Sequence, residues 1–395
     1  MIAENMKAKV AGNSVIRQMF EEGKAMAKVY GAENVYDFSL GNPNIPAPAS
    51  VNKAILDILE NEDPLRVHGY MSNAGFEETR QAIADDLNMR FGTSYRLENV
   101  ILTAGAGSAM NIALKTLLNP GDEVLVFAPY FVEYRNYIGN YYAETVEVPP
   151  LADGSFLPDV AGMEARITEK TKAVILNSPN NPTGVIYPVS VIRELAAALQ
   201  RGADRVGHPI YIISDEPYRE LVYDDQEVAH LPSYYADTVI GYSISKSLSL
   251  PGERLGYLLV PDASHEAEEF ITAATIANRI SGIVNAPSLI QLAIARCLEE
   301  KADLDFYAKN GAALYDGLTK MGYECLEPQG AFYLWVKAPC DEHDFVVALK
   351  EEHILVTPGS AFAGPGYVRI SYCVAHETIL NSMPGFRKVM EACQR

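Results

Sequence analysis

The sequence predicts an α/β protein whose large domain has a mostly parallel sheet covered by helices on both faces, together with a smaller α+β domain. Its 395 residues exceed the ~250–300 at which a single core stops growing. Short apolar runs, such as residues 123–127 and 173–176, alternate with segments of helical periodicity, as in parallel sheets. After a helical region from His265 to about Tyr315, strands and helices mix, which indicates the second domain.

Apolar residues recur with helical spacing in several segments. The first expected helix runs from Val15 to Tyr30, and Gly31 follows it as a stop signal. Further helices are expected over Ser108–Leu118, directly after a glycine-rich turn, and over Val191–Leu199.

Short apolar runs bounded by turn residues predict the strands. The first, Tyr36–Leu40, enters a proline-rich loop. The strands expected in the central sheet lie at Val100–Leu102, Glu123–Phe127, Ala173–Leu176, Ile210–Ser214, Val239–Ser243 and Tyr257–Val260. Those expected in the smaller domain lie near Phe332–Val336, Ile354–Val356 and Val368–Ser371. We expect the large domain at residues 46–290 and the small domain at residues 1–45 and 291–395.

The composition is that of a globular protein, with 48% hydrophobic and 21% charged residues. The formal net charge of −19 argues against nucleic acid or an anionic membrane as a partner, because an acidic surface repels both. The five cysteines show no CxxC or metal-ligand spacing, so we expect reduced thiols and no metal site. Residues 1–7 lack an apolar signal core, and no apolar run approaches the ~20 residues of a membrane span. A cytoplasmic location is expected.

One lysine follows an apolar strand and lies between hydroxyl side chains and an arginine. In the segment Ser243–Tyr257, Lys246 comes just after the strand that ends at Ser243. Open α/β sheets bind ligands at the carboxyl ends of their strands, and a lysine there can form a Schiff base. Ser243 and Arg254 are suited to hold a phosphate. The segment therefore predicts an anchor for a phosphorylated aldehyde, with a solvated surface loop as the alternative.

Two other strand ends carry polar residues at the same expected edge of the sheet. Asn181 lies in the loop Asn177–Gly184 after one strand, and Asp215 and Tyr218 follow another. A buried carboxylate can keep the nitrogen of a pyridine ring protonated, which makes the ring an electron sink. Asp215 suits that role, while Asn181 and Tyr218 can hydrogen-bond a phenolate oxygen of the same ring. Helix capping, turn formation and core packing are the alternative explanations.

Three further features fit a phosphorylated ring and an acidic substrate. The turn Thr103–Ser108 joins a strand to a helix with small residues, so backbone N–H groups can approach a phosphate, although any tight strand-to-helix turn uses glycine. Phe131, after the next strand, offers a face for stacking, although such aromatics also serve as core. Arg369 lies within an apolar strand, where a buried guanidinium needs an anion. A substrate carboxylate or an internal salt bridge would satisfy it.

Taken together, these residues resemble the class I, fold-type I aminotransferases that use pyridoxal phosphate, the aspartate aminotransferase group. The similar motifs cover nearly the whole chain in the same order: Leu40–Pro43, His68–Tyr70, Gly105–Gly107, Asn181–Gly184, Asp215–Tyr218, Ser243–Lys246, Arg254 and Arg369. The resemblance implies a transaminase of amino-acid metabolism with pyridoxal 5'-phosphate as its cofactor. It would transfer the amino group of an L-amino acid, aspartate-like, to a 2-oxo acid such as 2-oxoglutarate.

The resemblance also implies a role for each matching residue. Lys246 would form the Schiff base and move the proton, Asp215 would pair with the pyridine nitrogen, and Tyr218 would act at the phenolate oxygen. The remaining cofactor contacts would come from Tyr70, Gly105, Ala106, Gly107, Phe131 (or Tyr130), Asn181, Ser243 and Arg254. The substrate would be bound by Gly41, Asn181 and Arg369. Because Tyr70 would reach the phosphate held by the neighbouring subunit, the resemblance implies a homodimer with shared active sites.

The chain departs from the pattern of aspartate-preferring relatives at two positions. Phe131 replaces a frequent tryptophan, and Gly107 occupies a place where lysine is common. Both departures affect the expected substrate more than the cofactor. Arg17 and Arg279 are the spare arginines that can read a distal carboxylate, with an ordinary surface charge as the alternative for each. A carbon–sulfur β-lyase and a non-catalytic ligand sensor with the same body are the alternative functions.

Overall fold

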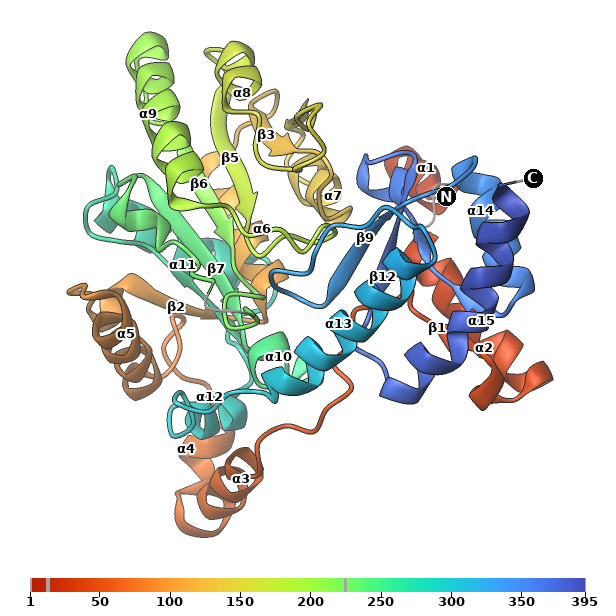
Figure 1. The fold of residues 1–395 in the computed structure, drawn as a ribbon. Coiled ribbons are helices and arrows are strands. Elements are labelled where there is room, and N and C mark those ends of the chain that lie inside the picture. The colour runs from red at the N-terminus through yellow and green to blue at the C-terminus, as the bar shows by residue number, and fades with distance from the viewer. Residues whose placement is uncertain (1, 12–14, 224–225, 395) are drawn as a thin grey trace. The chain divides into compact units, whose positions relative to one another are not determined.

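The computed structural model describes residues 2–11, 15–223 and 226–394, and its chain divides into two compact units (Figure 1). The large unit comprises Ile45–Asn180 and Val185–Leu304. The small unit comprises Met1–Asn44, Asn181–Gly184 and Asp305–Arg395. The domain boundaries expected from the sequence, 46–290 against 1–45 with 291–395, stay a prediction.

Within the described residues, the large unit contains a seven-stranded sheet of strand order β2-β8-β7-β6-β5-β3-β4 (Figure 1). Its strands are β2 (Val100–Thr103), β3 (Glu123–Phe127), β4 (Glu144–Val148), β5 (Thr171–Asn177), β6 (Tyr211–Asp215), β7 (Thr238–Ser243) and β8 (Gly256–Leu259). Strands β4, β3, β5, β6 and β7 pair in parallel, and β8 runs antiparallel to both β2 and β7. The predicted mostly parallel sheet is confirmed.

The helices of the large unit are α3 (Ala49–Asn61), α4 (Pro64–His68), α5 (Glu77–Phe91), α6 (Ala106–Leu117), α7 (Glu133–Gly139), α8 (Val160–Arg166), α9 (Val189–Val206), α10 (Ile244–Ser247), α11 (Ala267–Ile280) and α12 (Ser288–Ile294). Helix α9 shows why such segments form: Ile192, Leu195 and Leu199 are buried at helical spacing. Its C-cap, Gly207, adopts the left-handed conformation with φ of 78° and so ends the helix.

Alternation along β7 shows that helices cover both faces of the sheet. Ile240 and Tyr242 join a buried cluster with residues of α3, α5 and α12. Gly241 points the opposite way, where a β-carbon would lie 3.2 Å from the sulfur of Met110 on α6. Helix α6 also packs against β8 and α11. The sheet is therefore a buried layer, which accounts for the all-apolar strands in the sequence.

The small unit combines helices with short strands. Its helices are α1 (Glu4–Ala11), α2 (Val15–Tyr30), α13 (Leu304–Lys320), α14 (Glu342–Glu351) and α15 (His376–Cys393). Its strands are β1 (Tyr36–Asp37), β9 (Tyr333–Lys337), β10 (Ile354–Leu355), β11 (Thr357–Pro358) and β12 (Tyr367–Ser371). In the described residues β11, β12 and β9 form an antiparallel sheet, and β1 pairs in parallel with β10. Across the described chain, no helix combines the length and apolarity that a bilayer crossing needs.

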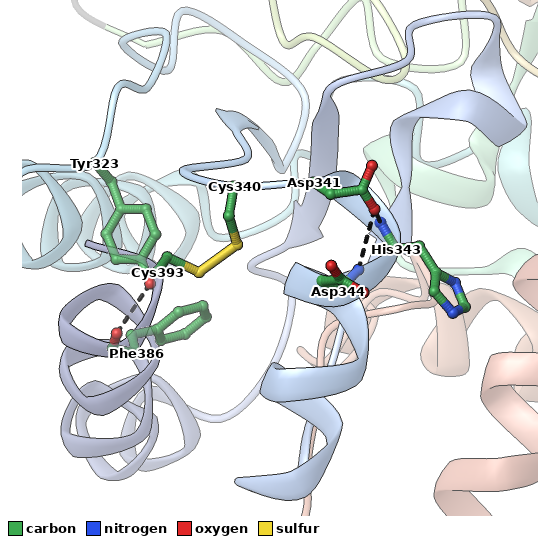
Figure 2. The surroundings of a disulfide bond; sticks show 7 residues. All are labelled: Tyr323, Cys340, Asp341, His343, Asp344, Phe386 and Cys393. Carbon is green, nitrogen blue, oxygen red and sulfur yellow. Dashed lines mark hydrogen bonds between the residues drawn. A yellow bond between two sulfur atoms is a disulfide. The ribbon is translucent and has the colours of Figure 1, made fainter. Parts of the chain in front are cut away.

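A disulfide joins Cys340 to Cys393 within the small unit (Figure 2). The last residue of α15 lies beside the segment that leads into α14, with the two Cα atoms 5.6 Å apart. Asp341 follows at once as the N-cap of α14, and its carboxylate accepts N–H bonds from His343 and Asp344. The expectation that all five thiols are reduced is therefore wrong for this pair. Their 53-residue separation left no local signal in the sequence.

Candidate active site

The parallel register of the large sheet brings polar strand ends together. Asn177, the last residue of β5, pairs with Asp215, the last residue of β6, and Asp215 pairs with Gly241 of β7. The Asn177 amide donates to the Asp215 carbonyl at 2.8 Å, which ties the two ends. Strand β7 continues to Ser243, and Lys246 lies in the short helix α10 that follows. The prediction that Asp215 and Lys246 come from adjacent strand ends therefore agrees with the sheet.

The turn that carries Lys246 is fixed by its neighbours. The Ser243 hydroxyl accepts the Ser245 N–H at 3.0 Å and donates to the Ser245 hydroxyl at 2.6 Å, so it caps α10. The Tyr242 hydroxyl donates to the hydroxyl of Ser247 at 2.8 Å. These contacts on both sides of Lys246 hold its backbone, while Lys246 itself is half-buried. The lysine therefore projects from an ordered turn.

Asp215 is a buried carboxyl group with one oxygen satisfied. Its Oδ2 accepts the Tyr134 hydroxyl at 2.5 Å, and its Oδ1 has no hydrogen-bond partner among the described residues. The pKa of Asp215 is raised to about 7, mainly by burial and also by the charge of Glu216, while the Tyr134 hydrogen bond lowers it. A buried oxygen without a partner is costly unless a ligand supplies a donor. A protonated ring nitrogen is a donor of the required kind.

A buried ion pair anchors the turn after β6. Arg219 lies 3.2 Å from carboxylate oxygens of both Glu216 and Glu220, and its guanidinium stacks 4.2 Å from the ring centre of Tyr242. Arg219 also donates to the hydroxyl of Tyr257 on β8 at 3.0 Å. The turn that holds Asp215 and the buried Tyr218 is thus linked to β7 and β8. This network lies next to the site residues in the sequence and positions them.

The predicted phosphate turn is a close backbone packing site. Gly105 has φ of +81°, and a β-carbon there would lie 2.8 Å from Nη2 of Arg254, so this guanidinium lies against the turn. At Gly256 a β-carbon would lie 2.3 Å from the Tyr242 carbonyl and 2.9 Å from Cα of Gly105. Helix α6 begins here and presents its first-turn N–H groups. The buried hydroxyl of Ser108 has no hydrogen-bond partner in the described chain. Arg254, these N–H groups and Ser108 suit an anion.

Of the two aromatic candidates for stacking, Tyr130 is engaged elsewhere. Its hydroxyl donates to Glu147 at 2.6 Å, and the guanidinium of Arg135 lies over its ring. Phe131 is half-buried and meets Tyr134 edge-on, with ring centres 5.7 Å apart. Phe131 is therefore the better candidate to face a planar ring.

The substrate-binding candidates Arg369, Asn181 and Gly41 belong to the small unit. Arg369 is 2% exposed, donates to Oδ1 of Asn181 at 2.9 Å and donates to the Ser39 carbonyl at 2.6 Å. Its guanidinium lies between the rings of Tyr333 and Phe362, 4.6 and 4.7 Å from their centres. Gly41 lies against Tyr333, where a β-carbon would be 2.2 Å from the hydroxyl. The structure therefore brings these three residues together and fixes the plane of the guanidinium.

The remaining candidates differ in exposure. Tyr70 is 93% exposed in the loop between α4 and α5. Arg279 is exposed on α11. The side chain of Arg17 lies outside the described residues, so its role as a reader of a distal carboxylate stays a prediction. In the described part of the chain, no cluster of histidine, cysteine and acidic residues is placed to hold a metal ion.

The chain belongs to the family described as aminotransferase class I and II, whose family model matches residues 32–382. It is a transaminase that uses pyridoxal 5'-phosphate, with an amino acid and a 2-oxo acid as substrates. The residues of the large unit fit this cofactor. The unpartnered Oδ1 of Asp215 suits its ring nitrogen, and the turn beside Arg254 suits its phosphate.

Individual relatives are named more specifically. The chain is 32% identical to the aspartate aminotransferase of Thermotoga maritima, covering 93% of this chain and 95% of the relative. It is 31% identical to the aspartate/prephenate aminotransferase of Thermus thermophilus, covering 89% of each. Among solved structures, an amino transferase from Eubacterium rectale covers 100% of both chains with 43% identity and a TM-score of 0.96. The Thermus thermophilus aspartate aminotransferase with maleate is 28% identical with a TM-score of 0.86, covering 98% of this chain and 100% of that one.

Tyr134 is a site residue that sequence reasoning missed. It lies on α7, 81 residues before Asp215. Burial raises the pKa of the Tyr134 hydroxyl well above its usual value, and the charge of Asp215 adds to the shift. The hydroxyl therefore stays protonated and serves as a donor. No sequence signal connects the two residues, because only the folding of the chain brings Tyr134 to Asp215.

We predict that Asp215 makes the stability of the cofactor-free chain depend on pH. Its folded-state pKa of about 7 lies above the ordinary 3.8, so the folded state binds this proton more tightly than the unfolded state. Stability from this group is present at low pH and is lost as the pH rises through about 7. The free energy of unfolding of Asp215→Asn, relative to that of wild type, should therefore rise between pH 5 and about 7. Above about pH 7 the difference should stay constant. Denaturant titration across this range measures the difference.

Tyr134→Phe is the companion variant. It removes the hydrogen bond that lowers the pKa of Asp215, so the loss of stability should extend to higher pH than in wild type. Parallel pH profiles for wild type and Asp215→Asn would contradict the prediction.

Proposed function

We propose that this transaminase exchanges amino groups between an aspartate-like dicarboxylic amino acid and a 2-oxo acid such as 2-oxoglutarate. Relatives named aspartate aminotransferase support this substrate class, as does the neighbouring structure with maleate, which is a dicarboxylate. The observation that best supports the proposed amino-group exchange is that Asp215 and Lys246 lie at the ends of adjacent strands. A location in the cytoplasm is also proposed, on the sequence features that led to this expectation.

In this proposal the residues of the large unit perform the proton chemistry. When bound, the cofactor supplies a ring that withdraws electrons from the substrate's α-carbon. Lys246 would take the α-proton on Nζ and pass it to the cofactor carbon that receives the amino group, and in the second half-reaction it would move a proton in the opposite direction. Oδ1 of Asp215 holds a proton on the ring nitrogen, while Tyr134 keeps Oδ2 hydrogen-bonded. Tyr218 would hydrogen-bond the phenolate oxygen, and Phe131 would stack on the ring. The cofactor contact that the resemblance implies for Asn181 stays a prediction.

Phosphate binding is proposed for Gly105, Ala106, Gly107, Ser243 and Arg254. The first turn of α6 supplies N–H donors, and Arg254 supplies a charge-assisted fork. Ser243 has a second role, because its hydroxyl already caps α10. A hydrogen bond between Ser243 and the phosphate would therefore use the same hydroxyl oxygen that caps α10.

Arg369 is proposed to bind the substrate's α-carboxylate, with Gly41 and Asn181 beside it. A planar guanidinium matches a carboxylate with two parallel N–H donors. The Asn181 amide and the Ser39 carbonyl hold one edge of the guanidinium, and aromatic rings cover its faces. The orientation of the fork is thus set before substrate arrives, which reduces the entropy lost on binding.

The first test of function is the fate of Lys246. Wild type should transfer the amino group of aspartate to 2-oxoglutarate, and Lys246→Ala should lose nearly all turnover while it retains some cofactor. The reason is that Nζ both anchors the cofactor and moves the proton. Borohydride reduction of the loaded wild type, followed by peptide mapping, should label Lys246.

Lys301→Ala is a control, because that lysine is exposed. A label on any other lysine would contradict the assignment. Pyruvate formed from cystine without an oxo acid would instead favour the carbon–sulfur β-lyase.

The second test concerns the α-carboxylate. Arg369→Leu should weaken the binding of amino acid and oxo acid together, by about 2–5 kcal/mol if a buried charge pair is broken. Arg369→Lys keeps the charge but loses the fork, so it should recover only part of the affinity. Half-saturation concentrations for both substrates measure the effect.

Arg387→Leu on α15 is the matched control, since Arg387 is exposed in the same unit. If Arg369→Leu left both half-saturation concentrations unchanged, the arginine would serve the small unit's structure alone.

We also propose a homodimer in which Tyr70 contacts the cofactor's phosphate in the partner subunit. Its 93% exposure in a single chain supports this, because an exposed tyrosine in a glycine-flanked loop gains little unless a partner covers it. Mixing Tyr70→Phe with Lys246→Ala should give heterodimers in which one site is intact and the other carries both lesions. Activity should then exceed the average of the two parents. Strictly additive activity, after subunit exchange has been demonstrated, would show that Tyr70 acts within its own chain.

A further inference from the structure

Helix α7 presents a second tyrosine to the cofactor site. Tyr137 follows Tyr134 by three positions, so the two side chains share one face of the helix. Tyr134 reaches Asp215, at the end proposed for the ring nitrogen. Tyr137 reaches the start of α6, at the end proposed for the phosphate. Its hydroxyl lies 3.0 Å from the place where a β-carbon of Gly107 would be.

The contact between Tyr137 and Gly107 links two features of the sequence. A glycine at 107 offers only its backbone N–H to a ligand at the first turn of α6. The absent side chain leaves space above that turn, and the hydroxyl of Tyr137 occupies it. Within the described residues, no hydrogen bond of this hydroxyl to protein is found. A polar group is therefore delivered to the phosphate turn from a neighbouring helix.

The charges around Tyr137 fit a donor that meets an anion. The pKa of Tyr137 is raised to about 12, mainly by burial and also by the charges of Asp215 and Glu133, while Arg254 lowers it. The phenol is consequently protonated at neutral pH. The guanidinium of Arg254 lies against Gly105 in the same turn, so a phosphate attracted by Arg254 and the helix start comes within the reach of this phenol.

We propose that Tyr137 is a further cofactor-binding residue, whose hydroxyl donates a hydrogen bond to the phosphate beside the first turn of α6. The inference rests on the proposed placement of the phosphate at this turn. It assigns to α7 the positioning of both ends of the cofactor, with Tyr134 acting through Asp215 at one end and Tyr137 acting directly at the other.

The test compares two ligands that differ only in the phosphate. The full-length chain, after removal of its cofactor, is titrated with pyridoxal 5'-phosphate and separately with pyridoxal, and binding is followed by absorbance. Tyr137→Phe should weaken pyridoxal 5'-phosphate by about tenfold, as expected for a hydrogen bond to a charged group. The same variant should leave the affinity for pyridoxal unchanged. Equal affinities for wild type and Tyr137→Phe, or equal losses for both ligands, would overturn the inference.

Two further variants separate this inference from the function on which it rests. Tyr141→Phe is the matched control, because its hydroxyl donates to the backbone carbonyl of Asn111 at 3.0 Å and should not affect the preference for the phosphorylated ligand. Arg254→Gln should lower that preference more than Tyr137→Phe does. If Arg254→Gln left it intact, the proposed phosphate site itself would be wrong. If Tyr137→Phe kept this preference while Arg254→Gln lost it, the proposed phosphate site would be supported and Tyr137 would not belong to it.

Discussion

The register of three parallel strands is the constraint on which the rest of the large unit depends. Pairing of β5, β6 and β7 sets Asn177, Asp215 and Gly241 in one row across the sheet. Because side chains alternate between the faces, a slip of one residue would turn Asp215 toward the opposite layer of helices. The antiparallel β8 then fixes Ser243 against Gly256. The distance between the lysine turn and the acid is thus set by backbone hydrogen bonds rather than by mobile loops.

The buried carboxyl of Asp215 is an unfavourable group that the surrounding structure tolerates. Desolvation opposes its ionised form, and a single hydrogen bond from Tyr134 offsets only part of that cost. The neighbouring buried arginine, Arg219, is instead held by two glutamates and an aromatic face. The charge of Arg219 is therefore balanced by its partners, whereas the carboxyl group of Asp215 is only partly satisfied. Incomplete satisfaction of a buried acid is typical of a site prepared for a cationic group.

The sequence predicted the site residues that lie next to strand ends, and it missed the residues that other elements bring to the site. Asp215 and Lys246 were identifiable because strands of a parallel sheet end at one edge. Tyr134 and Tyr137 were not, since the rotation of α7 decides which of its side chains face the site. The pair Cys340 and Cys393 was missed because chain folding alone brings these residues together. The assignment of Asn181–Gly184 to the small unit by its contacts also had no sequence signal.

The packing at Gly256 limits how this chain can vary. Its α-carbon faces a carbonyl of β7 and the backbone of the phosphate turn, so even a methyl group would push β8 away from one of them. In a library of random variants, substitutions at this position should be eliminated although its backbone φ permits any residue. Gly105 faces both a steric and a conformational restriction, with its φ of +81°. The two positions are thus restricted by different neighbours: backbone atoms of Tyr242 and Gly105 exclude a side chain at Gly256, whereas the Arg254 guanidinium and the positive φ disfavour one at Gly105.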